Sequence, residues 1–125
     1  MCSAYGIKTV KALRTGPGLT KPGVAPYAAF AVLLDGYQPG LRGGTGARSD
    51  WDLAADLVRS GFRVILAGGL GPDNLGEALA AVHPLAVDLN SGVEIRPGIK
   101  DHALLHRAMA VIAGGKPRTG EERPW

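Results

Sequence analysis

Short apolar segments alternate with longer amphipathic segments along most of the chain. Each apolar segment is bounded by glycine, proline or polar residues and is too short for a typical helix, which indicates a buried strand. We predict such strands at residues 7–13, 31–34, 63–67 and 85–89. The amphipathic segments repeat apolar residues at helical spacing. They predict helices that begin after Ser49 or Asp50, with Pro72 in the first turn, and after Asp101.

The order of these elements indicates the fold class. Uniformly apolar strands that alternate with helices are typical of a parallel sheet covered by helices, an α/β fold. The return between the first two strands, residues 14–30, shows no convincing helix. The loop after each strand is richer in glycine and polar residues than the return, and such loops carry function in α/β folds. We expect residues 1–113 to form this domain and residues 114–125 to be a disordered tail.

Composition removes several classes of partner. Of the 125 residues, 46% are apolar and 20% are charged, which is ordinary for one globular domain. The net charge of +3 is spread along the chain without a basic, aromatic-rich helix, so we expect no nucleic-acid partner. No apolar run approaches the roughly 20 residues of a membrane span, so we expect no membrane partner. Cys2 is the single cysteine and cannot form an internal disulfide, which favours a cytoplasmic location.

Asp35 ends the second predicted strand and opens the long polar loop 36–48. A carboxyl group at the rim of a strand end can donate a proton, because partial burial favours its protonated form. The alternative is a structural carboxylate that binds a backbone N–H or an arginine. Within the loop, residues 43–46 (GGTG) lack the spacing of a phosphate-binding motif. Either this loop closes over a substrate or it is a plain connection.

Small residues follow the third and the fourth predicted strands. Gly68 and Gly69 lie between a strand and a helix start, where backbone N–H groups can approach an anion with the helix dipole behind them. Asn90, Ser91 and Gly92 follow the next strand. Two successive loops of this kind form the phosphate site of many (βα)8 barrels. The pair therefore favours phosphate binding over two tight turns that bind nothing.

Asp88 lies within the last predicted strand, between apolar neighbours. A buried carboxylate is costly without partners, so we expect Asp88 to serve either a site or an internal polar network. Glu94, in the next loop, either shapes the rim of that site or is solvated. The histidines show no metal-ligand spacing, so we expect no metal site. We expect surface positions for His83, His102 and His106.

Five motifs stand in an order that resembles one enzyme family. They are LLDG at 33–36, GGTG at 43–46, DW at 50–51, ILAGGLGPDN at 65–74 and VDLNSGVEIRPGIKD at 87–101. The series is similar to the C-terminal half of phosphoribosylanthranilate isomerase over residues 7–112, and its last two motifs are specific. The resemblance implies half of a (βα)8 TIM barrel, in which the predicted strands match the fifth to the eighth.

The resemblance also implies a reaction and the residues for it. The family carries out the Amadori rearrangement of N-(5'-phosphoribosyl)anthranilate to 1-(2-carboxyphenylamino)-1-deoxyribulose 5-phosphate in tryptophan biosynthesis, without a cofactor. Asp35 matches the general acid that protonates the ribose ring oxygen, and Asp88 matches an acid near the sugar hydroxyls. The residues that match the backbone phosphate site are Gly68, Gly69, Asn90, Ser91 and Gly92.

The resemblance implies no general base within this chain. The family's base is a cysteine in a KICG motif on the first barrel strand, and neither that motif nor the early arginine for the anthranilate carboxylate is present. Cys2 precedes the strand that matches the fifth, so it is not that cysteine. A (βα)8 barrel takes about 250 residues. We therefore expect the chain to be inactive alone and to need a complementary N-terminal half, or to self-associate.

Two other functions stay open at this point. The first is a non-catalytic half-barrel that binds phosphosugars through the anion loops. The second is a different phosphosugar barrel enzyme, which the stretch from SGVE to PGIKD disfavours because related phosphate loops normally differ there.

Overall fold

Four parallel strands form one sheet in chain order, which confirms the expected α/β class. The strands are β1 (Val10–Arg14), β2 (Ala31–Asp35), β3 (Val64–Ala67) and β4 (Ala86–Val87). The structure, a computed structural model, describes residues 2–16, 19–36 and 46–114. The expected loop over residues 36–48 and the expected tail from residue 114 therefore lie largely outside the described residues.

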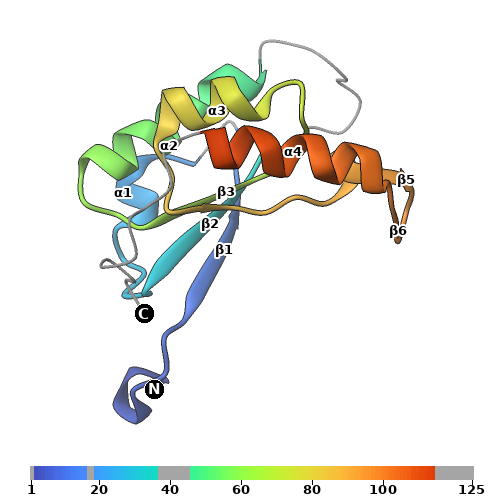
Figure 1. The fold of residues 1–125 in the computed structure, drawn as a ribbon. Helices are drawn as coiled ribbons and strands as arrows, with labels where there is room; N and C mark the ends of the chain where they lie inside the picture. The colour runs from blue at the N-terminus through green and yellow to red at the C-terminus, as the bar shows by residue number, and fades with distance from the viewer. Residues whose placement is uncertain (1, 17–18, 37–45, 115–125) are drawn as a thin grey trace.

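Helices lie over one face of this sheet (Figure 1). They are α1 (Lys21–Val24), α2 (Gly46–Arg59), α3 (Leu75–Val82) and α4 (His102–Gly114). Each helix follows a strand along the chain, and parallel crossovers of one hand place successive helices on the same side. A short 3-10 helix, η1 (Cys2–Tyr5), precedes β1. In the described part of the chain, no helix has the length and apolarity to cross a membrane.

The strand boundaries differ from the prediction at both edges of the sheet. β1 begins at Val10 rather than residue 7, because its pairing with β2 starts where Val10 faces Ala31. Ile7 lies ahead of that pairing and is 57% exposed. β4 is shorter than predicted, because it pairs with β3 only at Ile65 and Leu66. The two inner strands, predicted at 31–34 and 63–67, are confirmed to within one residue.

Two of the predicted helix starts are wrong. α2 begins at Gly46, ahead of Ser49 and Asp50, because residues 46–49 offer no large apolar side chain that periodicity could detect. Pro72 lies in the turn before α3 and not in its first turn, since Asn74 occupies the N-cap position.

The predicted cap of α4 is confirmed. The Oδ1 atom of Asp101 accepts hydrogen bonds from the N–H groups of Ala103 and Leu104, at 2.9 and 3.1 Å. These groups have no partner within the helix, so the carboxylate satisfies two free donors of the first turn.

An antiparallel hairpin between β4 and α4 was not expected. It follows a 3-10 helix, η2 (Ser91–Val93), and consists of β5 (Glu94–Arg96) and β6 (Ile99–Lys100). Figure 1 shows it beside the start of α4, away from the main sheet. Its strands are too short and too polar to give an apolar run, so hydropathy could not reveal them.

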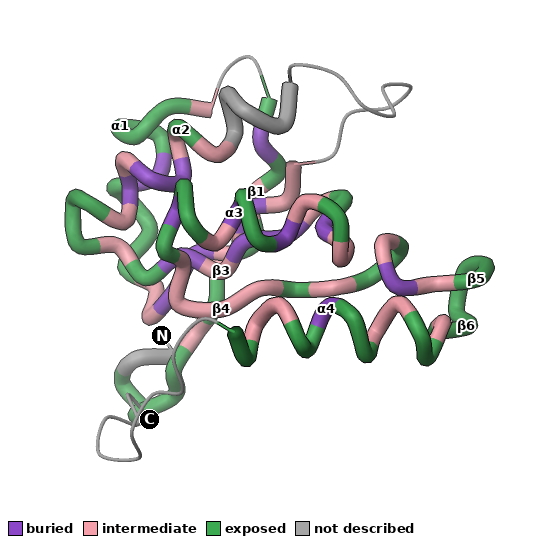
Figure 2. The backbone as a smooth tube through the Cα atoms, turned by 45° about the horizontal axis from the view of Figure 1, so that its top comes forward, coloured by how far each residue is buried: buried purple, intermediate pink, exposed green. Residues whose placement is uncertain are grey.

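The core lies between the sheet and its helices. Successive side chains of a strand point to opposite faces, and the alternate residues Val32, Leu34, Val64 and Leu66 are buried against the helices. Figure 2 shows the buried residues gathered where β3 meets α2 and α3. The opposite face carries Leu33 and Ile65, which are half-buried, and Val10, which is 50% exposed. The sheet therefore has one covered apolar face and one open apolar face.

Candidate functional site

The predicted site residues gather at one end of the sheet, where the carboxyl ends of its strands lie. Asp35 is the last residue of β2, Gly68 follows β3, and Asp88 follows β4. Because all four strands are parallel, their carboxyl ends meet at the same edge, where α/β folds place their ligands. The register places Asp35 opposite Ala67 of β3.

Asp35 and Asp88 lie on the open face, on either side of β3. Val87 pairs with Leu66, which points to the helices, so alternation along the strand turns Asp88 to the face that Ala67 and Asp35 share. Two strand spacings separate the backbones of the two aspartates, about 10 Å. The expected burial of Asp88 is wrong: its side chain is exposed, because β4 ends at Val87 and is the edge strand of the described sheet.

Thr15 fixes the backbone of Asp35. Its N–H and its hydroxyl both donate to the carbonyl oxygen of Asp35, at 2.9 and 3.1 Å. Thr15 is buried, with 5% of its surface exposed, so water does not compete strongly for these bonds. On the other side, the N–H of Gly36 donates to the carbonyl of Ala67 at 3.4 Å. The predicted acid is therefore held between its two neighbouring strands.

Gly68 packs directly against Asp35. A Cβ atom on Gly68 would lie 2.4 Å from the Gly36 nitrogen and 2.9 Å from the Asp35 Oδ1 atom. The φ angle of Gly68 is +89°, a left-handed value that side chains disfavour. Only glycine therefore fits at this position, and the first predicted anion loop touches the predicted acid.

The two predicted anion loops also touch each other. A Cβ atom on Gly92 would lie 2.0 Å from the carbonyl oxygen of Leu70, and one on Gly71 would lie 2.9 Å from the carbonyl oxygen of Gly92. The loop after β3 and the loop after β4 thus meet through their backbones. The structure brings Asp35 and both loops into one continuous set of contacts.

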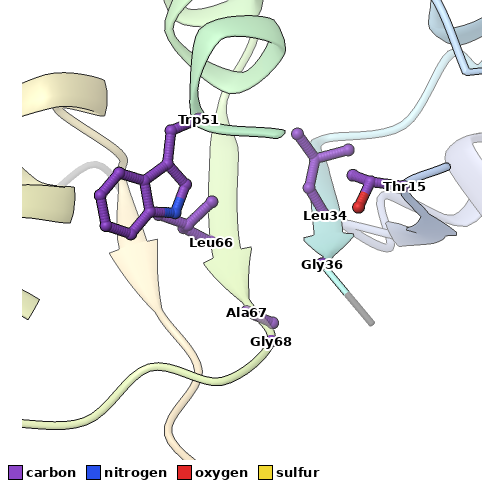
Figure 3. A pocket seen from close by; sticks show the side chains of 7 residues that line it. All are labelled: Thr15, Leu34, Gly36, Trp51, Leu66, Ala67 and Gly68. Carbon is purple, nitrogen blue, oxygen red and sulfur yellow. The ribbon is translucent and has the colours of Figure 1, made fainter. Parts of the chain in front are cut away.

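A small cavity lies at the carboxyl ends of β2 and β3, between Trp51 of α2 and Leu34 (Figure 3). Trp51 of α2 stands over Leu66 at one side of it, and Thr15 and Leu34 lie at the other. With about 20 Å³ it has room for a water molecule and not for a sugar phosphate. This cavity is therefore a packing gap and not a substrate site.

Glu94 and the three histidines lie outside this set of contacts. Glu94 is only 12% exposed and forms an ion pair with Lys100 at 3.0 Å, so it is not a solvated loop residue. His83, His102 and His106 are exposed, as predicted. Among the described residues no group of three His, Cys, Asp or Glu side chains could hold a metal ion. Residues 43–45 of the GGTG motif lie outside the described residues.

Sequence comparison shows which known proteins this chain is similar to. Residues 6–110 match the family model described as N-(5'phosphoribosyl)anthranilate (PRA) isomerase. The N-(5'-phosphoribosyl)anthranilate isomerase of Citrifermentans bemidjiense is 44% identical over 109 residues, which cover 87% of this chain and 52% of that protein. The enzyme of the same name from Myxococcus xanthus is 50% identical and covers 80% of this chain and 49% of its own length. The chain thus spans about half the length of these curated relatives.

Solved structures agree with the sequence relatives. Phosphoribosyl anthranilate isomerase from Thermococcus kodakaraensis superposes with a TM-score of 0.70 at 33% identity, over 91% of this chain and 56% of that one. Phosphoribosyl anthranilate isomerase from Thermotoga maritima superposes with a TM-score of 0.69 at 36% identity, over 89% of this chain and 54% of that one. A third structure of a phosphoribosyl anthranilate isomerase contains reduced 1-(o-carboxyphenylamino)-1-deoxyribulose 5-phosphate. It superposes with a TM-score of 0.64 at 31% identity, over 89% of this chain and 51% of that one.

Proposed function

The chain belongs to the N-(5'-phosphoribosyl)anthranilate isomerase family, and on this premise we propose that it forms the C-terminal half of a (βα)8 barrel of that family. β1 to β4 then correspond to the fifth to the eighth barrel strand. A barrel strand points one face at the helices and the other at the barrel interior. The open face with Leu33 and Ile65 fits that interior. In this proposal residues 1–113 are the half-barrel domain and residues 114–125 are a tail.

The proposed activity is the Amadori rearrangement of N-(5'-phosphoribosyl)anthranilate, in the cytoplasm. One relative's structure contains a reduced form of the product of this reaction, a sugar phosphate with an anthranilate group. We assign the same ligand class to the open face of this chain. The chemistry consists of proton transfers, so the proposal requires no cofactor.

Asp35 is the proposed general acid. Its carboxyl group donates a proton to the ribose ring oxygen, the C1–O bond breaks, and the nitrogen lone pair forms a protonated Schiff base at C1. Loss of the C2 proton then gives an enol, which becomes the ketone product. The base for that proton comes from a complementary N-terminal half, on the same polypeptide or on a separate one.

The phosphate site is proposed at the two loops after β3 and β4. Backbone N–H groups of Gly68, Gly69, Asn90, Ser91 and Gly92 are the candidate donors. The backbones of Asp88 and Asp35 are two strand spacings apart, about 10 Å, and we propose that the ribose binds between the two side chains. The observation that carries the proposal is the close packing of Gly68 on Asp35 and of Gly92 on Leu70, because it joins the acid and both loops in one unit.

The test is a complementation assay that follows the loss of phosphoribosylanthranilate fluorescence. The chain is mixed with the N-terminal half of the Citrifermentans bemidjiense relative, and Asp35→Asn is compared with Asp52→Asn. Asp52 is an exposed carboxylate on α2 and serves as the matched control. We expect Asp35→Asn to lower the turnover rate at least about a hundredfold, the typical contribution of a general acid, and Asp52→Asn to leave it unchanged.

Two results contradict this proposal. Equal turnover by Asp35→Asn and the wild type excludes Asp35 as the acid. Tight binding of the reduced product without turnover in any mixture supports a non-catalytic phosphosugar-binding half-barrel instead.

A further inference from the structure

Asn74 bridges the backbone of the loop after β3. Its Nδ2 group donates to the carbonyl oxygen of Gly69 at 2.9 Å, and its Oδ1 atom accepts from the N–H of Gly71 at 2.9 Å. The loop contains two left-handed glycines, Gly68 at φ +89° and Gly69 at φ +63°. A chain of such flexible residues has many alternative conformations, and the two hydrogen bonds of Asn74 select one of them.

Lys100 holds the loop after β4 in a comparable way. Its ammonium group donates to the main-chain carbonyl of Asn90 at 3.1 Å and to the Asn90 side-chain oxygen at 3.2 Å. The same group is paired with Glu94 at 3.0 Å, and the Glu94 side chain is only 12% exposed. Lys100 lies on β6, so the hairpin brings a cation to the main chain of the loop after β4.

Both contacts orient a neighbouring N–H group. In a planar trans peptide the carbonyl and the following N–H point in opposite directions. The carbonyl of Gly69 points to Asn74, so the N–H of Leu70 points away from Asn74, and in the same way the N–H of Ser91 points away from Lys100.

These two N–H groups are candidate anion donors. Among the residues that the structure describes, neither N–H has a hydrogen-bond acceptor. A ligand oxygen would satisfy such a donor, and the backbone contact between Gly92 and Leu70 keeps the two loops together.

We infer that Asn74 and Lys100 are positioning residues of the phosphate site, which aim the N–H groups of Leu70 and Ser91 without touching the phosphate. This inference rests on the proposed function. It adds one donor, Leu70, and assigns a role to two side chains whose spacing in the sequence gives no hint of it.

The test measures substrate kinetics and inorganic phosphate binding on the chain mixed with the complementary half. Asn74→Ala and Lys100→Met are expected to raise KM and the Kd for inorganic phosphate about tenfold, equivalent to about 1.4 kcal/mol, with kcat within about twofold. Lys100→Arg restores a cationic donor and is expected to recover part of the loss. Asn74→Asp keeps only the acceptor for Gly71, and we expect it to remain impaired.

Asp73→Ala and Arg107→Met are the matched controls. The two side chains form an exposed ion pair of 2.7 Å next to the loop after β3, and none of the hydrogen bonds described above involves them. Both controls are expected to keep the wild-type KM. Thermal unfolding of each variant checks that it is folded.

The outcomes separate this inference from the proposed function. Turnover with unchanged KM and phosphate Kd in all four Asn74 and Lys100 variants overturns the inference alone. Phosphate binding without turnover in the wild type overturns the function, while the Kd values of the variants still decide the inference. A wild type that neither binds phosphate nor turns over substrate overturns both.

Discussion

At the scale of single residues, the proposed site depends on backbone contacts that leave no room for a side chain. Gly68 is the clearest case, because a Cβ atom there would overlap the Gly36 nitrogen and approach the Asp35 carboxylate. The conformation of the proposed phosphate loop and the position of the proposed acid are therefore coupled through one glycine. A change at Gly68 should reach the chemistry, although Gly68 itself carries no reactive group.

Gly68→Ala tests this coupling against Gly61→Ala. Both glycines have left-handed φ angles, +89° and +90°, but a Cβ atom on Gly61 would meet nothing within 4 Å. Both substitutions should therefore cost about 1–2 kcal/mol from backbone strain, and Gly68→Ala should cost more, because its Cβ atom also overlaps the Gly36 backbone. Only Gly68→Ala should also lower kcat in the complementation assay, by about tenfold or more, because the backbone at Asp35 must shift. Equal kcat values for the two folded variants would contradict the coupling.

The proposed site residues could be predicted from the sequence, whereas the residues that hold them in place could not. Asp35 and the glycine loops follow apolar strands, and this position alone suggested a role. Thr15 and Lys100 act through hydrogen bonds to main-chain atoms of other segments, and Asn74 acts through hydrogen bonds that depend on how its own loop turns. Thr15 is 20 residues from its partner. Such contacts depend on the fold and not on residue type or spacing, so a single sequence could not reveal them.

At the scale of elements, strands and helices with a clear apolar pattern were found and those without one were missed. The inner strands β2 and β3 are buried on the helix side and gave strong apolar runs. The hairpin of β5 and β6 is mostly exposed and polar, and the first turn of α2 has no large apolar residue. The lengths of the edge strands depend on pairing partners, which hydropathy does not report. The cap of α4 was predicted because it depends only on local residue type.

Asp101→Ala should destabilise the protein by about 1 kcal/mol, the usual cost of losing a helix N-cap. The two N–H groups of Ala103 and Leu104 would lose their shared acceptor. Asp101→Asn keeps an oxygen in the same place and should lose only a fraction of that stability. Urea unfolding of the complemented protein, followed by circular dichroism, measures both variants. A difference of less than about 0.3 kcal/mol between alanine and wild type would show that the cap contributes little.

At the scale of the whole molecule, the sheet is covered on one side only. The helices bury Val32, Leu34, Val64 and Leu66, whereas the opposite face exposes part of Val10, Leu33 and Ile65. Apolar faces of this kind normally pack against a partner. The chain spans about half the length of its curated relatives. In the proposed half-barrel, a complementary N-terminal half would cover this face and supply the base.

The most direct test of this account is turnover as a function of added N-terminal half, at a fixed concentration of the chain. We predict no turnover without the added half, a rise in the turnover rate with each addition, and saturation at one half per chain. Turnover by the chain alone would contradict it, because the base would then lie within these 125 residues. Absence of turnover at every ratio, with a one-to-one complex demonstrated by native mass spectrometry, would contradict the proposed activity while leaving the half-barrel intact.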